Sequence, residues 1–146
     1  MAVILRIFIG SILLVSGLEK VISPYQNFMY VIQGYEFLPS WMEKIVALSM
    51  PWAELIVGIF LVLGLWIQFS LKAAMLLFAG FIVVVGQALI RSLPIDQCGC
   101  FGESIHIPPK VIIVFDSFML LVTMWLLRNP SKVNRCSLDK SKYFLK

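Results

Sequence analysis

Two cysteines that flank a single glycine, in the run Cys98-Gly99-Cys100-Phe101-Gly102, are the residues of this chain best suited to chemistry. Thiols this close can form a disulfide without help from the rest of the fold, and Gly99 gives the backbone the freedom that a short ring requires. A disulfide in so short a ring departs from relaxed geometry, which raises its reduction potential and favours thiol exchange. We therefore interpret Cys98 and Cys100 as a candidate redox pair.

Two other interpretations of this pair stay open. The cysteines could form a permanent disulfide that only holds the shape of the turn. They could also bind copper(I) together with His106, the only histidine of the chain, because soft thiolate ligands suit that ion. Three ligands without a fourth do not fit a structural zinc site, so we assign no metal. The third cysteine, Cys136, is far along the chain and is expected to be a bystander.

Four further residues are candidates to support redox chemistry. Arg91 and His106 lie close to the cysteines in the sequence, where a cation would favour the reactive thiolate and a histidine could accept a proton. Glu54 and Asp116 each interrupt an apolar segment. Placing a carboxylate inside a membrane costs free energy, so such a residue is expected to have a structural or functional role. The plainer interpretation is that each binds a polar neighbour such as Gln87 or Arg91. The functional one is proton transfer near a quinone.

The composition places this chemistry in a membrane. The chain has 146 residues, of which 60% are hydrophobic and 14% are charged, whereas a soluble domain needs about a quarter charged residues. The apolar residues form blocks of about twenty, the length that a helix needs to cross a bilayer. The sequence predicts an all-α bundle of four membrane-spanning helices in one domain, residues 1–127, followed by a basic tail, 128–146. The expected spans are Ala2 to Ile22, Ile45 to Ile67, Ser70 to Ile90 and Pro109 to Leu127.

The distribution of basic residues predicts the orientation, because cytoplasmic segments carry the excess of Lys and Arg. With four spans both termini lie on one side, together with Arg6, Lys72 and the basic residues of the tail: Arg128, Lys132, Arg135, Lys140, Lys142 and Lys146. The other side has Lys20, Lys44, Arg91 and Lys110, diluted by acidic residues. We therefore expect cytoplasmic termini and an extracytoplasmic cysteine turn, in the compartment where disulfides persist. Anionic lipid explains the basic tail without nucleic acid.

The connection between the first two spans, from Ser23 to Lys44, is rich in aromatic residues. Such residues suit the headgroup layer of a membrane. Within it, Tyr25 to Gln33 is expected to form a short helix that lies on the membrane surface. The connection could also form a lid over the cysteine turn or the rim of a quinone site.

Three motifs together resemble the DoxX/MauE family of membrane proteins. They are the run RIFIGSILLVSGLEKVISP that begins at Arg6, the run Pro51-Trp52-Ala53-Glu54-Leu55 with Gly58 and Gly64 after it, and the CGCFG turn after the third span. The resemblance covers about residues 1–127, and the CGCFG turn is similar to the MauE branch. It implies a four-helix protein of the bacterial inner membrane in which Cys98 and Cys100 are the redox pair and Glu54 is a shared position.

The resemblance also implies partners. The MauE branch is associated with a periplasmic thioredoxin-like protein and with maturation of a disulfide-rich client, which favours thiol–disulfide exchange and makes a thiol-disulfide oxidoreductase activity one interpretation. The rival expectation is a non-catalytic accessory subunit of a larger, respiratory-type membrane complex, with the cysteines as a structural disulfide. The full quinone-coupled relay of other disulfide-generating bundles needs a second cysteine pair, which this chain does not have.

Overall fold

Five helices make up the part of the chain that the computed structural model describes, which is residues 2–36, 38–91 and 108–130. They are α1 (Ala2–Ile22), α2 (Tyr25–Gly34), α3 (Ser40–Leu63), α4 (Ile67–Ile90) and α5 (Pro109–Arg128). Four of them, all except α2, are long and apolar enough to cross a membrane. The protein is therefore an all-helical, multi-pass membrane protein, as the sequence predicts.

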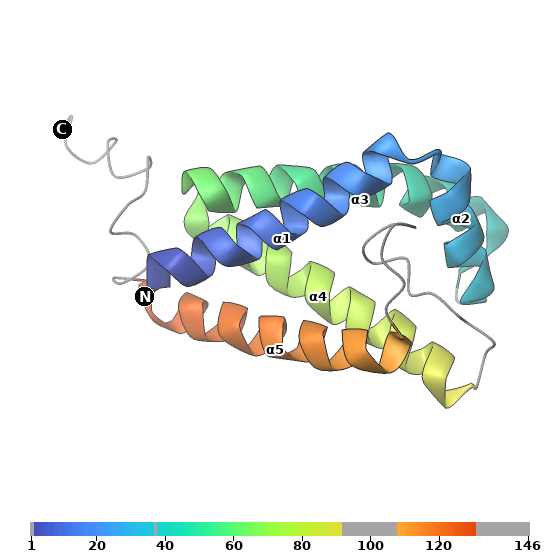
Figure 1. The fold of residues 1–146 in the computed structure, drawn as a ribbon. Helices are drawn as coiled ribbons and strands as arrows, with labels where there is room; N and C mark the ends of the chain where they lie inside the picture. The colour runs from blue at the N-terminus through green and yellow to red at the C-terminus, as the bar shows by residue number, and fades with distance from the viewer. Residues whose placement is uncertain (1, 37, 92–107, 131–146) are drawn as a thin grey trace.

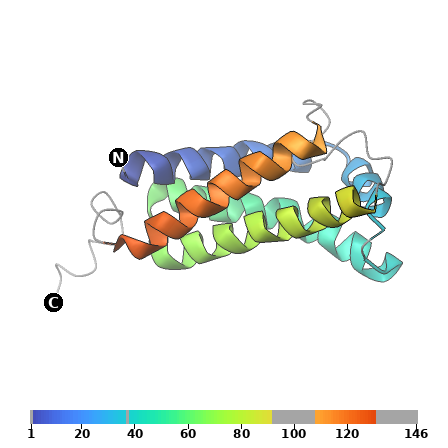
Figure 2. The ribbon, with the colours of Figure 1, turned by 90° about the horizontal axis from the view of Figure 1, so that it is seen from below.

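The long helices form two close pairs. The most extensive contacts join α1 to α3 and α4 to α5, while α3 also packs on α4 and α1 on α5. The two pairs run side by side along the length of the bundle (Figures 1 and 2). The start of α1 and the end of α5 lie at one end of the bundle, whereas α2, the end of α4 and the start of α5 lie at the other end (Figure 1). We call the latter the α2 end.

Glycines set the spacing of the α1–α3 pair. An added Cβ at Gly58 would lie 2.8 Å from the backbone nitrogen of Leu14, and one at Gly17 would lie 2.9 Å from the carbonyl oxygen of Pro51. Side chains do not fit at these distances, so the two backbones approach as closely as small residues allow. This contact brings the polar positions of α1 and α3 against each other.

The second span differs from the expected range, because it begins at Ser40 rather than Ile45 and ends at Leu63 rather than Ile67. Pro51 lies inside the helix without ending it. The helix ends at Gly64, which takes the left-handed conformation (φ 73°, ψ 37°) that glycine adopts at little cost. Trp66 also has a positive φ, 41°, directly before α4. The turn therefore lies at residues 64–66, a few residues before the expected position.

The short helix expected over Tyr25 to Gln33 is present as α2, which runs to Gly34. It packs mainly on α3 and caps the α2 end of the bundle. Its C-terminal side is tied to α4, because the side-chain amide of Gln87 donates a hydrogen bond to the carbonyl oxygen of Tyr35 at 3.3 Å. Tyr35 is itself buried in a small cluster with Val85, Ala88 and Ile112.

Candidate functional site

A buried ion pair between α1 and α3 is the centre of the candidate site. Lys20 Nζ lies 2.7 Å from Glu54 Oε1 and 2.8 Å from Oε2, and neither side chain has any exposed surface. Ser16, one helical turn before Lys20, accepts a hydrogen bond from Nζ at 2.9 Å and donates one to Glu54 Oε2 at 2.8 Å. The three hydrogens of the ammonium group therefore have three oxygen acceptors. We call these three residues the ion-pair cluster.

Aromatic rings complete the surroundings of the lysine. Nζ lies 5.4 Å from the ring centre of Phe28 on α2 and 5.2 Å from that of Phe81 on α4. A cation near the face of an aromatic ring is attracted by the electrons of the ring. Side chains from α1, α2, α3 and α4 thus converge on one ammonium group. An ionised pair in a membrane interior needs this degree of compensation, because each charge has lost its water.

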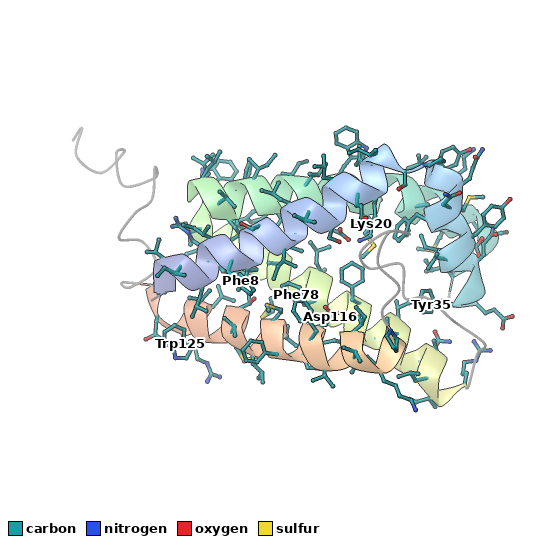
Figure 3. The ribbon with its side chains drawn as sticks, in the orientation of Figure 1. Phe8, Lys20, Tyr35, Phe78, Asp116 and Trp125 are labelled. Atoms are coloured by element: carbon teal, nitrogen blue, oxygen red, sulfur yellow. The ribbon has the colours of Figure 1, made fainter. Side chains whose placement is uncertain are left out.

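Asp116 on α5 supplies a second carboxylate to the same half of the bundle. Its exposed fraction is 4%, and its Oδ2 atom has no hydrogen-bond partner among the described residues. It is close enough to Lys20 and Glu54 to interact with both charges. Figure 3 shows Lys20, Asp116 and Tyr35 toward the α2 end, with Phe8 and Trp125 toward the other. Among the described residues, the site therefore contains one cation and two carboxyl groups.

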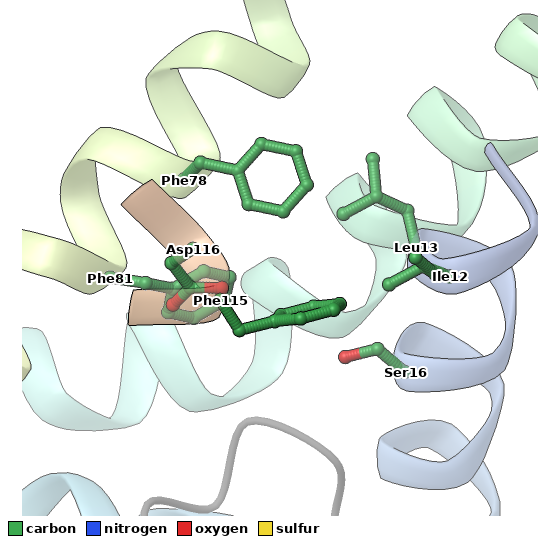
Figure 4. Close-up of a pocket in the computed structure, with 7 residues that line it drawn as sticks. All are labelled: Ile12, Leu13, Ser16, Phe78, Phe81, Phe115 and Asp116. Atoms are coloured by element: carbon green, nitrogen blue, oxygen red, sulfur yellow. The ribbon is translucent and has the colours of Figure 1, made fainter. Parts of the chain in front are cut away.

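A small cavity joins Asp116 to the ion-pair cluster. It is lined by Ser16 and Asp116 and by five apolar side chains, Ile12, Leu13, Phe78, Phe81 and Phe115 (Figure 4). Its volume is about 10 Å³. A quinone ring is far larger than this, so the cavity does not fit the quinone that the sequence raised as a candidate cofactor.

Tyr35 marks the boundary of this region at the α2 end. Its side chain is buried, with 4% of its surface exposed. Burial, together with the negative charge of Asp116, raises the pKa of Tyr35 to about 12. The phenol therefore stays neutral at physiological pH and adds no charge to the site.

Of the six residues proposed from the sequence, Glu54 and Asp116 come together in the structure. Cys98, Cys100 and His106 lie outside the described residues. Arg91 is exposed at the end of α4, where it donates a hydrogen bond to the carbonyl oxygen of Glu36 at 3.3 Å and lies 4.0 Å from its carboxylate. Glu54 binds polar neighbours, as the plainer interpretation expects, but these are Lys20 and Ser16 rather than Gln87 or Arg91.

Lys20 and Ser16 are site residues that the hydropathy of the sequence does not reveal. Lys20 lies near the end of the first span, where the sequence predicts a charge on the outer side of the membrane. The signal was present in the spacing: Ser16 and Lys20 are four residues apart and so share one helix face, which also carries Leu13. This spacing predicts an ion pair, because it places a lysine on the buried face of one span and the next span contains a glutamate.

Fold and site together define a class: a small helical membrane protein that holds a lysine–glutamate pair and a nearby aspartate inside its bundle. Over residues 1–128 the chain matches the family described as methylamine utilisation protein MauE. The chain belongs to the MauE family. The methylamine utilization protein MauE of Paracoccus denitrificans is 27% identical over 117 residues, which are 80% of this chain and 62% of that protein. This chain therefore matches less than two thirds of that relative's length. No solved structure matches the chain.

Proposed function

We propose that this protein exchanges electrons between thiols and disulfides through Cys98 and Cys100, with a thioredoxin-like protein or a disulfide-containing client outside the cytoplasm as its partner. The observation that carries the proposal is the Cys-x-Cys motif in the sequence between α4 and α5. The two helix ends that this segment joins, Ile90 and Pro109, lie at the α2 end of the bundle, the half that contains the buried carboxyl groups. Membership of the MauE family agrees with this proposal.

The chemistry is a reversible two-step exchange. Written for the oxidised pair, a thiolate of the partner attacks one sulfur, forms a mixed disulfide and releases the other cysteine as a thiolate, which takes up a proton. The second thiol of the partner then attacks the mixed disulfide, loses its proton and releases the remaining cysteine. Two electrons pass to Cys98 and Cys100, which become thiols, and the partner becomes a disulfide.

The remaining candidate residues are assigned to proton movement and thiolate stabilisation. Glu54 and Asp116 are proposed to hold or pass protons inside the bundle, while His106 and Arg91 are proposed to act near the thiols. The ion-pair cluster supports the first assignment, because it contains groups that exchange protons and hydrogen-bond one another. We derive no step through a quinone, since the cavity beside Asp116 is too small for one.

The proposed location is the bacterial inner membrane, with both termini in the cytoplasm and the cysteine turn outside it. The excess of basic residues in the tail and at Arg6 and Lys72 supports this orientation. The name of the Paracoccus relative connects that protein with methylamine utilisation, and a role of this chain in the same process is proposed on that name.

The test is to trap the thiols in living cells by acid quenching and alkylation, before and after a pulse of reductant. We expect the Cys98–Cys100 pair to change its redox state during the pulse. Cys98→Ser or Cys100→Ser should trap a mixed disulfide through the remaining cysteine, and mass spectrometry should identify the partner. Cys136→Ser is the matched control and should trap nothing new.

A pair that stays oxidised through the pulse, with no partner trapped by either variant, would overturn the proposal. The cysteines would then be a structural disulfide. In that case the accessory-subunit alternative predicts that the protein copurifies with a larger membrane complex and that a double Cys→Ser variant stays in it.

A further inference from the structure

The cavity between Ser16 and Asp116 has the size and lining of a site for one water molecule. Its volume of about 10 Å³ is at the lower limit for a single water, for which about 10–15 Å³ are needed. Apolar cavities of this size stay empty, but this one has a hydroxyl group and a carboxyl group in its wall (Figure 4). A buried water needs at least two polar partners, and Ser16 and Asp116 provide them.

Asp116 gives an independent reason for a ligand here. It is 96% buried, and its Oδ2 atom has no partner among the described residues. Leaving a buried carboxyl oxygen without a hydrogen bond is unfavourable, because nothing replaces the water that this oxygen loses on burial. Such atoms in native structures are commonly satisfied by an ordered water. The atom without a partner and the cavity beside it therefore point to the same occupant.

The charges of the region indicate what this water connects. Among described groups, α1 contributes Lys20 and Glu19, α3 contributes Glu54, and Tyr35 at the end of α2 is neutral. The side chains of α4 that line the cavity, Phe78 and Phe81, carry no charge. Among the described groups, Lys20 is the one cation whose charge reaches Asp116, and Glu54 and Ser16 already accept its three hydrogens.

We propose that the cavity holds one water molecule, and that Asp116 with this water is a binding site for one exchangeable proton. The Oδ2–H group of Asp116 donates a hydrogen bond to the water, which lies against the Ser16 hydroxyl. Ser16 in turn donates to Glu54 and accepts from Lys20. The water thereby joins the aspartate of α5 to the ion-pair cluster of α1 and α3 in one polar path. This proton site rests on the proton-holding role proposed above for Asp116 and deepens it, whereas the water site does not depend on the cysteines.

The first test locates the water in the full-length protein in lipid vesicles. The protein is mixed with ¹⁸O-labelled water and exposed to X-rays at once, before a trapped water exchanges with the solvent. The X-rays turn water into hydroxyl radicals, which add their oxygen to nearby side chains. A residue beside trapped water therefore receives ¹⁶O instead of ¹⁸O. We expect ¹⁶O on Phe115, which lines the cavity, and little on Phe118, which is 59% exposed on the lipid side of the same helix. Asp116→Leu should reduce the labelling of Phe115 several-fold, and Asp116→Asn should retain it.

The second test locates the proton by infrared spectroscopy of the same vesicles at neutral pH. We expect a carbonyl band of a protonated carboxylic acid that shifts in D₂O and disappears in Asp116→Asn. The amide is close in size to the acid, so this variant is expected to fold, and gel filtration checks that it does.

Equal labelling of Phe115 and Phe118 would overturn the water site. A band that survives in Asp116→Asn, or no such band in the wild type, would overturn the proton site. None of these outcomes tests the thiol exchange at the cysteines.

Discussion

Lys20 near the end of the first helix and Glu54 in the middle of the third lie 2.7 Å apart, with both side chains completely shielded. Ser16 binds both of them, so one contact between two helices satisfies the charged groups of α1 and α3 together. The pair lies where the glycine-mediated approach of the two backbones is tight, at Gly17 and Pro51. Close backbone packing and charge pairing therefore depend on each other here.

Removal of one member of this pair should destabilise the protein strongly. Lys20→Met leaves the Glu54 carboxylate buried without its cation, a change that costs about 3–5 kcal/mol in the free energy of unfolding. Replacing both residues with methionine should cost less than Lys20→Met alone, because no buried charge remains. Thermal unfolding in detergent, followed by circular dichroism, measures these changes.

The matched control for this prediction is Lys110→Met on α5. Lys110 is exposed, so its replacement should change the free energy of unfolding by less than about 0.5 kcal/mol. Equal melting temperatures of Lys20→Met and Lys110→Met would show that the buried pair does not stabilise the bundle.

A methyl group at Gly58 should separate α1 from α3. Its Cβ would meet the backbone of Leu14 at 2.8 Å and of Gly10 at 2.9 Å, and backbone atoms cannot turn away as a side chain can. We expect Gly58→Ala to lower the free energy of unfolding by about 1–3 kcal/mol. Gly80→Ala is the control, because nothing lies within 4 Å of its added Cβ and alanine favours the helix by up to about 1 kcal/mol. Melting temperatures that fall equally in the two variants would contradict the prediction.

The pKa of Tyr35 predicts a loss of stability at high pH. The folded protein raises this pKa from about 10 to about 12, so it holds the phenol proton more tightly than the unfolded chain. The stability linked to Tyr35 is complete below about pH 10 and decreases as the pH rises toward 12. Absorbance titration of the phenolate should show a late component that Tyr35→Phe removes. Tyr30→Phe, at an exposed position, should leave that component in place.

The proposed orientation predicts the behaviour of reporters at the C-terminus. The basic tail is expected in the cytoplasm, where green fluorescent protein folds and alkaline phosphatase stays inactive. A C-terminal fluorescent fusion should therefore be bright, and the matching phosphatase fusion should have only background activity. The opposite pair of results would place the cysteine turn in the cytoplasm and remove the compartment that the thiol exchange requires.

The sequence alone determined the class of the fold and two residues of the site. Blocks of apolar residues indicate membrane-spanning helices because a bilayer offers no other partner for the backbone. Glu54 and Asp116 were identifiable because carboxylates within such blocks need a reason. The pattern of aromatic residues also predicted a short helix over Tyr25 to Gln33, which the structure confirms as α2.

The tertiary structure decided which residues meet. Lys20 lies at a helix end, where the sequence is equally consistent with a surface charge, and only the packing of α1 on α3 buries it against Glu54. The end of α3 depends on the left-handed conformation of Gly64, which hydropathy does not report. The cavity beside Asp116 exists only where side chains of α1, α4 and α5 face one another. Hydropathy depends on each residue and its neighbours in the chain, whereas ion pairs and cavities depend on distances between helices.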